Sequence, residues 1–243
     1  MTARRIFCEG PDDRSALREL ITRGGFGRSI DRTVSKSPTG PDRTDVFKKV
    51  VAEDLALTIA GDDDRVLSVA RDVAFTAASP SSPVRLVGLS FDPDDYDEPR
   101  WRQWIESAFR EQAPVRIEGG DGYLLTGPFG PVTLVPLPWS ITAIPHTGLP
   151  ERQCLERVAG QSLSAVHAPL AGLVDKWLVE ARDHGRVPSW KMAARLWNGL
   201  VLDGVSGAAF FDKVFGQERS FGESCRRELT GTMLWRGLML LCE

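Results

Sequence analysis

Apolar and polar positions in the first part of the chain alternate between strand-like and helix-like stretches. Residues 4–8 end in three apolar residues, Ile6, Phe7 and Cys8, and Glu9 follows them, which predicts a buried strand. Apolar residues then recur at helical spacing through Leu20, so a helix should follow at once. The nearly continuous apolar run over residues 84–91 is typical of a parallel strand that is covered on both faces. The pattern therefore predicts a sheet in which strands alternate with helices.

Further elements follow from the same periodicities. The pattern predicts short strands over residues 115–117, 123–126 and 132–137, and helices over 45–60, 100–112, 151–163, 167–184, 189–203, 207–215 and 221–242. Residues 66–78 are ambiguous, because their length favours a helix while their valines permit a strand. We expect an α/β fold: a mostly parallel sheet flanked by helices over residues 1–160, with a helical C-terminal region, residues 161–243, packed on it.

Composition narrows the functional classes only a little. The 243 residues carry a net charge of -3, which neither announces nor excludes a nucleic-acid-binding protein. The four cysteines lie far apart and form no CxxC pair, so neither a zinc site nor a disulfide framework is expected. No stretch approaches the about 20 apolar residues of a membrane span, and residues 1–5 run directly into the first strand without a signal peptide. We therefore expect a cytoplasmic protein.

Acidic residues stand at the ends of two predicted strands. Glu9 follows the first strand, while Asp92 and Asp94 follow the strand over residues 84–91. Open α/β sheets place their chemistry at the carboxyl ends of strands, so these three carboxylates are predicted to share one site. Magnesium prefers hard oxygen ligands, usually one or two carboxylates completed by water and phosphate oxygens. The spacing therefore predicts a divalent cation between Glu9, Asp92 and Asp94.

Two segments carry a resemblance to a known family. Residues 6–17 (IFCEGPDDRSAL) resemble the first motif of the Toprim family, in which an apolar strand ends in Glu-Gly and a helix follows after an Asp. Residues 91–95 (FDPDD) resemble the family's Asp-x-Asp motif at the end of a later strand. The resemblance covers roughly residues 4–160 and extends to small Toprim proteins and to the nuclease half of overcoming-lysogeny-defect proteins. It implies a Toprim-like sheet.

The resemblance also implies roles for individual residues. Glu9 would be the general acid/base, and Asp92 and Asp94 would bind Mg²⁺ or Mn²⁺, with Glu9 able to complete a second metal site. Glu156 matches a Leu-Glu pair that opens a helix in related proteins and would be a further acid of the cluster, although a plain surface acid fits equally well. Lys191 resembles a basic residue near the metals, where it would neutralise phosphate charge as part of the catalytic machinery; a solvated lysine is the alternative.

Two functions remain open. The first is a magnesium-dependent nuclease acting on DNA or RNA. The second is a non-enzymatic or partner-dependent Toprim module of a phage-defence or DNA-repair complex, working beside a separate ATPase. The apolar segment 233–241 would be either a core helix or an interface between copies of a homo-oligomer. The sequence leaves open whether Asp13, Asp72, Asp95 or Asp97 joins the acidic site, and we expect most of these to be helix caps or loop tips.

Overall fold

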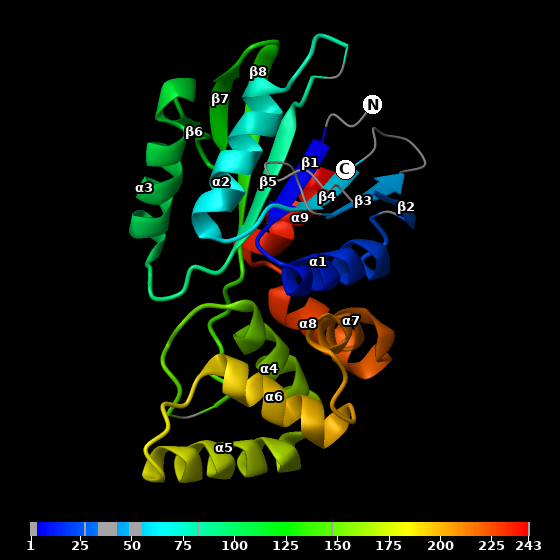
Figure 1. Cartoon of the computed structure of the whole chain (residues 1–243), viewed down its shortest axis with the longest axis vertical. Helices are drawn as coiled ribbons and strands as arrows, with labels where there is room; N and C mark the ends of the chain where they lie inside the picture. Colours follow the sequence, from blue (N-terminus) through cyan, green and yellow to red (C-terminus); the bar gives the residue numbers. More distant parts are fainter. Residues whose placement is uncertain are drawn as a thin grey trace.

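A single sheet forms the centre of the computed structural model, which describes residues 4–26, 28–33, 43–48, 55–81, 83–146 and 148–242. In this part of the chain the sheet has eight strands in the order β2-β3-β4-β1-β5-β8-β7-β6 (Figure 1). The strands are β1 (Arg4–Cys8), β2 (Arg28–Thr33), β3 (Arg43–Lys48), β4 (Leu55–Ile59), β5 (Leu86–Phe91), β6 (Val115–Arg116), β7 (Tyr123–Gly127) and β8 (Gly130–Pro138).

The middle of the sheet is parallel and its two edges are antiparallel. Strands β4, β1, β5 and β8 run parallel to one another, while β2 and β3 extend one edge and β7 and β6 the other. Strands β1 and β5 are direct neighbours, with Arg4 opposite Leu86 and Phe7 opposite Leu89. The predicted α/β class is therefore confirmed, and β1 and β5 lie next to each other, as a site shared by their ends requires.

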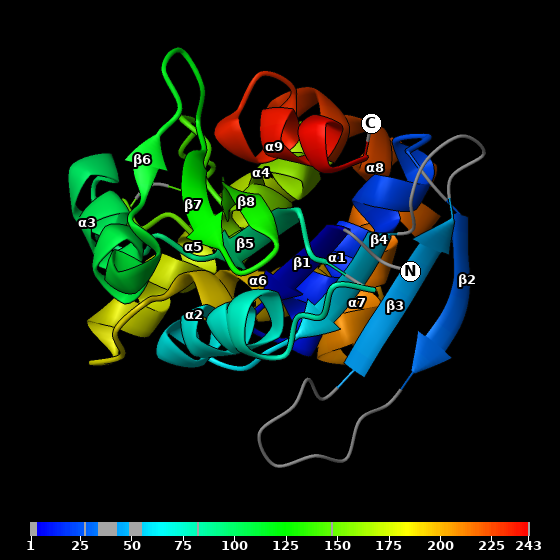
Figure 2. The same cartoon turned by 90° about the horizontal axis from the view of Figure 1, so that it is seen from above.

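Helices cover both faces of this sheet. They are α1 (Pro11–Arg23), α2 (Asp63–Arg71), α3 (Glu98–Ala108), α4 (Leu155–Val166), α5 (Ala168–Asp183), α6 (Trp190–Val201), α7 (Gly207–Asp212), α8 (Arg219–Leu229) and α9 (Met233–Cys242). Helices α1 and α9 lie against one face and α2 and α3 against the other (Figure 2). Side chains of β1 alternate between these layers, with Ile6 and Cys8 in the core that α1 and α9 share and Phe7 in the core of α2 and α3.

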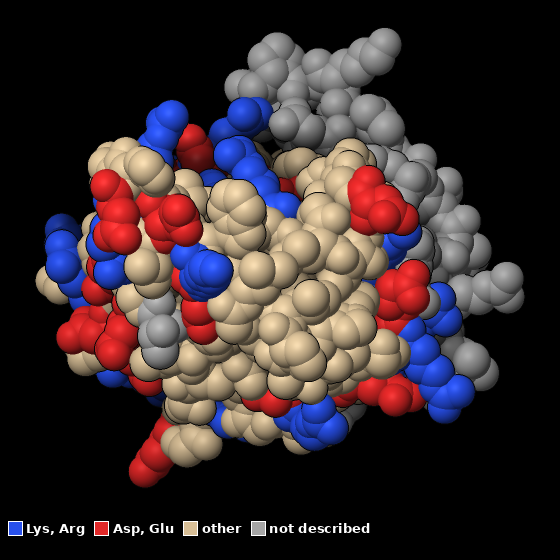
Figure 3. Space-filling view, turned by 90° about the horizontal axis from the view of Figure 1, so that it is seen from below, with Lys and Arg blue, Asp and Glu red and all other residues tan. Residues whose placement is uncertain are grey.

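The C-terminal helices extend the molecule beyond the carboxyl ends of the central strands (Figure 1). Helices α4 and α6 pack on each other, and α5 lies at the far end of the molecule. Helix α5 exposes Leu173, Trp177 and Val179. Figure 3 looks onto this end and shows uncharged side chains across its centre, with most charged side chains around them. No helix in the described ranges has both the length and the apolar run that crossing a bilayer requires.

The helix predicted over residues 45–60 is wrong. The chain instead forms β3 and β4 there, with residues 49–54 outside the described ranges. All five residues of β4 are buried, because β4 lies between β1 and β3 and is covered on both faces. Burial on both faces favours a continuous apolar run over the alternation that marks a half-exposed strand, and such a run can be mistaken for a buried helix.

Four other expectations can be compared with the structure. The ambiguous stretch 66–78 is helical, since α2 continues into a π-helical turn over Asp72–Thr76. The single helix expected over 221–242 is two helices, and Gly231 between them has φ 85°, a left-handed conformation that favours glycine and ends α8. Helix α4 crosses the expected boundary between residues 160 and 161.

Helix α9 packs against β8 and β5, with Leu234, Leu238 and Leu241 fully buried, so segment 233–241 is a core helix.

Close contact between α9 and β8 requires a glycine at position 237. A Cβ atom there would lie 2.5 Å from Leu137 Cδ2 and 2.9 Å from Val135 Cγ1, and both of these side chains are buried. We expect Gly237→Ala to lower the free energy of unfolding by up to about 2 kcal/mol, because an overpacking cost of about 1–3 kcal/mol is only partly offset by the helix-propensity gain of about 1 kcal/mol.

Urea unfolding measures this effect, with Gly172→Ala in α5 as the matched control. A Cβ at Gly172 would meet nothing within 4 Å, so the control should gain up to about 1 kcal/mol. Equal gains in both variants would contradict the close packing of α9 on the sheet.

Candidate carboxylate site

The first acid of the site stands where β1 turns into α1. Glu9 follows the last residue of β1, and Gly10 is the N-cap of α1 in an extended conformation. The side chain of Glu9 reaches across to the neighbouring strand end, where its Oε1 accepts the backbone N–H of Asp92 at 3.3 Å. The two strand ends that the sequence singled out are therefore in direct contact.

The second acid lies between the sheet and α4. Asp92 follows β5, and its Oδ1 accepts the backbone N–H of Leu155, the first residue of α4, at 2.9 Å. A helix N-terminus has unpaired N–H groups and a partial positive charge, which suits a carboxylate. Glu156 is the second residue of the same helix, so the expected Leu-Glu pair does open α4. The carboxyl end of the sheet and the start of α4 thus bring Asp92 and Glu156 to one place.

All five residues predicted for the site line one cavity. Glu9, Asp92, Asp94, Glu156 and Lys191 surround a space of about 260 Å³ between the strand ends and α6. The first four come from the strand ends and the start of α4, whereas Lys191 is the second residue of α6. A larger groove of about 700 Å³ also contains Glu9, Asp92, Glu156 and Lys191 in its walls, and it runs on past α1 and α7. The residues that the sequence singled out therefore line the same cavity.

The carboxylates of Asp92 and Asp94 have different partners, however. Asp94 has φ 55° and pairs its backbone with Gln153, and its carboxylate forms an ion pair with Arg152. Asp92 is instead engaged by the N-terminus of α4. Within the described ranges, no three His, Cys, Asp or Glu side chains are arranged as a group that could hold a metal ion by themselves.

Burial and like charge act together on the Asp92 carboxyl group. Its pKa is raised well above the ordinary value, first by burial and then by the negative charges of Asp13 and Glu156; the Leu155 N–H opposes this shift. Burial likewise raises the pKa of Asp12, with repulsion from Glu156 adding to it and Lys191 opposing it. Carboxylates held together against their mutual repulsion are more frequent at functional sites than elsewhere.

Asp13 is a buried member of this acidic cluster. Its Oδ1 accepts the indole N–H of Trp139 at 2.9 Å, and its Oδ2 accepts the backbone N–H of Gly10 at 3.3 Å. Burial raises the pKa of Asp13 to about 7, with Glu156 contributing, although both hydrogen bonds oppose the shift. The sequence leaves the role of Asp13 open. Its position three residues after Gly10 indicates only that it can accept a hydrogen bond from the backbone at the start of the helix. Nothing in the sequence pointed to Trp139.

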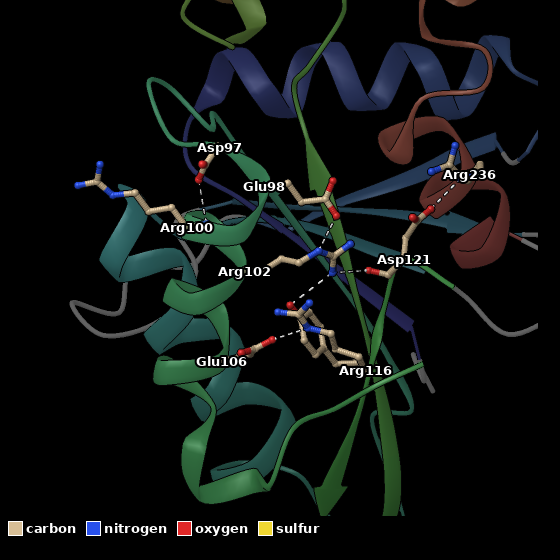
Figure 4. Close-up of polar contacts among 9 residues, drawn as sticks. Asp97, Glu98, Arg100, Arg102, Glu106, Arg116, Asp121 and Arg236 are labelled. Carbon is tan, nitrogen blue, oxygen red and sulfur yellow. Dashed lines mark hydrogen bonds and ion pairs between the residues drawn. The ribbon is translucent and has the colours of Figure 1, made fainter. Parts of the chain in front are cut away.

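The other acids left open lie elsewhere. Asp97 is the N-cap of α3, and its Oδ1 accepts the N–H of Arg100 at 3.1 Å (Figure 4). Asp72 is exposed in the π-helical turn after α2. Asp95 is also exposed and lines a neighbouring pocket, which adjoins the site through Asp92 and Asp94. Capping and loop-tip roles therefore account for these three residues.

A buried histidine fixes the helix that carries Lys191. His146 Nε2 accepts the indole N–H of Trp197 in α6 at 2.8 Å, so its Nδ1 carries the proton donated to Asp175 in α5 at 3.0 Å. Burial lowers the pKa of His146, which keeps the ring neutral in this arrangement. At the start of α6, the indole N–H of Trp190 donates to the carbonyl of Pro150 at 2.9 Å. These contacts hold the start of α6 over the strand ends.

The titration of Asp13 yields a stability prediction for the metal-free protein. A raised pKa means that folded Asp13 keeps a proton that the unfolded chain has already lost, so the contribution of Asp13 to stability falls as the pH rises from about 4 towards about 7. Asp13→Asn keeps an acceptor for Trp139 but cannot ionise. Urea unfolding across this window should therefore show the variant gaining stability relative to wild type as the pH rises. A difference that stays constant between pH 4 and 7 would contradict a buried, proton-retaining Asp13.

The fold of this chain is shared with a protein of known structure. No family model and no curated protein matches the chain. Among solved structures, the hypothetical protein PH0156 from Pyrococcus horikoshii OT3 is similar over 100% of both chains, with a TM-score of 0.72 and 18% sequence identity. At this identity the likeness concerns the fold alone, so it supports the α/β architecture.

Proposed function

We propose that this protein is a Mg²⁺- or Mn²⁺-dependent phosphoryl-transfer enzyme of the Toprim type, acting as a nuclease on DNA or RNA in the cytoplasm. The observation that carries the proposal is the contact between Glu9 and Asp92 at the ends of two adjacent parallel strands. Glu156 and Lys191 line the same cavity, so several carboxylates and the ammonium group of one lysine surround a space that is open to a ligand.

The donor chemistry fits a magnesium ion. Magnesium needs only one or two protein carboxylates, because water and substrate phosphate oxygens complete its shell. Asp92 and Glu156 would supply these oxygens, and Glu9, in the same cavity, would bind only a second ion. Asp94 would join them only if it were released from its ion pair with Arg152. A bound cation would relieve the repulsion among Asp13, Asp92 and Glu156.

Bound divalent cations would stabilise the charge that develops on the attacking and leaving oxygens of a phosphodiester. Glu9 is placed to exchange a proton with the attacking water or with the departing oxygen, as a general acid/base. Lys191, from the opposite wall of the cavity, would neutralise negative charge on the phosphate. Each role uses a side chain that lines the same cavity.

A cleavage assay tests the proposed activity. The purified protein is incubated with plasmid DNA, single-stranded DNA and single-stranded RNA in Mg²⁺, in Mn²⁺ and in EDTA. The proposal predicts cleavage of at least one substrate that depends on the metal. The assay is repeated with any ATPase encoded beside this protein, because activity that appears only then would identify a partner-dependent enzyme.

One observation favours the second function, a module that works through a partner. Helix α5 lies at the end of the molecule that Figure 3 shows and exposes the large apolar side chains of Leu173, Trp177 and Val179. An ATPase subunit or a second copy of this chain would bury such a surface. Wild-type inactivity in every assay, with and without the ATPase, would favour this non-enzymatic role over the nuclease.

A further inference from the structure

An aromatic pocket opens beside the carboxylate cavity. It has a volume of about 380 Å³, and its walls include Phe91, Tyr96, Trp101 and Trp104. The pocket shares Asp92 with the carboxylate cavity, so the two spaces adjoin at the end of β5. Its volume lies within the range of about 300–1,000 Å³ that is usual for small-ligand pockets.

We propose that this pocket is a subsite for one unpaired nucleobase of the substrate, next to the phosphate held at the carboxylate cavity. The inference rests on the proposed nuclease function and deepens it, because it assigns single-stranded or locally unpaired nucleic acid as the substrate class. Aromatic side chains bind bases by stacking, and this contact tolerates any sequence because every base has a flat face.

The aromatic residues of the pocket differ in how they are placed. Trp101 is 4% exposed and Phe91 is 2% exposed, so both belong to the core beneath the pocket. Trp104 is only partly buried and packs edge-to-face on Phe91, with ring centroids 5.5 Å apart. Tyr96 is 45% exposed, and the guanidinium of Arg100 lies 4.2 Å from the centre of its ring. Trp104 and Tyr96 are therefore the rings that a base can reach.

Helix α3, which carries Trp104, is a rigid platform. Arg102, on the same helix, donates to Glu98 Oε1 at 2.7 Å, to the carbonyl of Asp121 at 3.2 Å and to the Tyr123 hydroxyl at 3.4 Å (Figure 4). Its guanidinium also lies 4.8 Å from the centre of the Trp101 ring. These contacts tie α3 to β7 and to the turn before it, and a ring held in place loses little freedom when a base stacks on it.

Polar groups around the pocket suit a nucleotide as well. Arg152 lines both this pocket and the carboxylate cavity, where its guanidinium can meet a phosphate between the two. Asp64 and Asp95 lie in the pocket wall, and carboxylates accept hydrogen bonds from the exocyclic amino groups of bases. The same carboxylates also suit a cationic side chain of a protein partner, but continuity with the proposed phosphate site favours the base.

Binding and cleavage of short oligonucleotides test this inference. The substrate is a single-stranded octamer, compared with octamers that each lack one base at a single position. For wild type, removing the base that occupies the pocket should weaken binding by about 5–150-fold, the equivalent of losing one stacked base. Trp104→Ala and Tyr96→Ala should each weaken binding of the complete octamer, and Trp104→Ala should no longer distinguish it from the octamer without that base.

Matched variants separate stacking from loss of folding. Phe129→Ala removes an aromatic side chain that is 41% exposed in the turn between β7 and β8, at the opposite end of the sheet from the pocket, and should bind as wild type does. Tyr96→Ala covers the case in which Trp104→Ala fails to fold, which thermal melting detects, because Tyr96 is the more exposed ring. The octamers that lack one base test the stacking contact on the wild-type protein, so this part of the test does not depend on any variant folding.

The outcomes are distinguishable. Metal-dependent cleavage that ignores missing bases and both ring variants would overturn the subsite and leave the nuclease intact. A wild-type protein that neither binds nor cleaves any nucleic acid would overturn both. Quenching of tryptophan fluorescence by an arginine-rich peptide but not by the octamer, lost in Trp104→Ala, would overturn the subsite in favour of a cationic protein ligand.

Discussion

Replacing Glu9 by glutamine should lower the rate of metal-dependent nucleic-acid cleavage by about 10²–10⁴-fold, the usual contribution of a general acid/base. Glutamine has nearly the same size and keeps an oxygen that accepts the N–H of Asp92, so the contact between the strand ends survives. What is lost is the group that takes up and gives back a proton. Initial rates under single-turnover conditions, with saturating Mg²⁺ or Mn²⁺, measure this loss.

Two controls make the Glu9 result specific. Glu118→Gln changes the same functional group at an exposed position in the turn between β6 and β7, and its rate should equal that of wild type. The free energy of unfolding of Glu9→Gln should differ from that of wild type by about 1 kcal/mol or less, since glutamine keeps the size and an acceptor oxygen of glutamate. If Glu9→Gln cleaves as fast as wild type, the side chain has a structural role and the assignment of a general acid/base fails.

The second large effect is on metal affinity. Asp92→Asn should weaken Mn²⁺ binding by about 100-fold or more, because outer-shell changes alone cost about 10–100-fold and Asp92 is assigned a direct role. Asp94→Asn should weaken binding less, because its carboxylate is already ion-paired with Arg152. Wild-type affinity should also rise with pH, since burial and neighbouring acids raise the pKa of Asp92 and the ion must displace that proton.

Isothermal titration calorimetry with Mn²⁺ measures these affinities. Asp72→Asn removes the same charge from an exposed position outside the cavity and should leave the affinity unchanged. Equal affinities for wild type and Asp92→Asn would exclude Asp92 as a ligand. A larger loss in Asp94→Asn than in Asp92→Asn would show that the Asp94–Arg152 ion pair opens when the ion binds.

The strand ends that form the site could be predicted from the sequence because their signals are local. Apolar residues within 4–8 and 84–91 identify central parallel strands, and such strands place their carboxyl ends at one edge. Strand β4 gave a misleading signal, because a fully buried apolar run does not distinguish a strand from a helix. Its pairing with β1 decides the matter, and that pairing is a tertiary contact.

The partners of the site residues could not be predicted for the same reason. Asp94 meets Arg152 across 58 positions of the chain, and Asp13 meets Trp139 across 126. Neither pair leaves a local pattern, since each depends on how α4 and the segment after β8 return to the strand ends. The positive φ of Asp94, which goes with its turn towards Gln153 and Arg152, is equally invisible in an Asp-Pro-Asp motif that permits extended backbone.

The most direct test of the account is a crystal structure of the protein soaked in Mn²⁺, with anomalous scattering recorded to locate the ion. The account predicts an anomalous peak in the cavity between the strand ends and α6, with carboxylate oxygens of Asp92 and of Glu9 or Glu156 at about 2.0–2.2 Å. A fully soaked crystal with no peak in this cavity, or with its strongest peak at carboxylates elsewhere on the molecule, would contradict a metal-dependent site at the ends of β1 and β5.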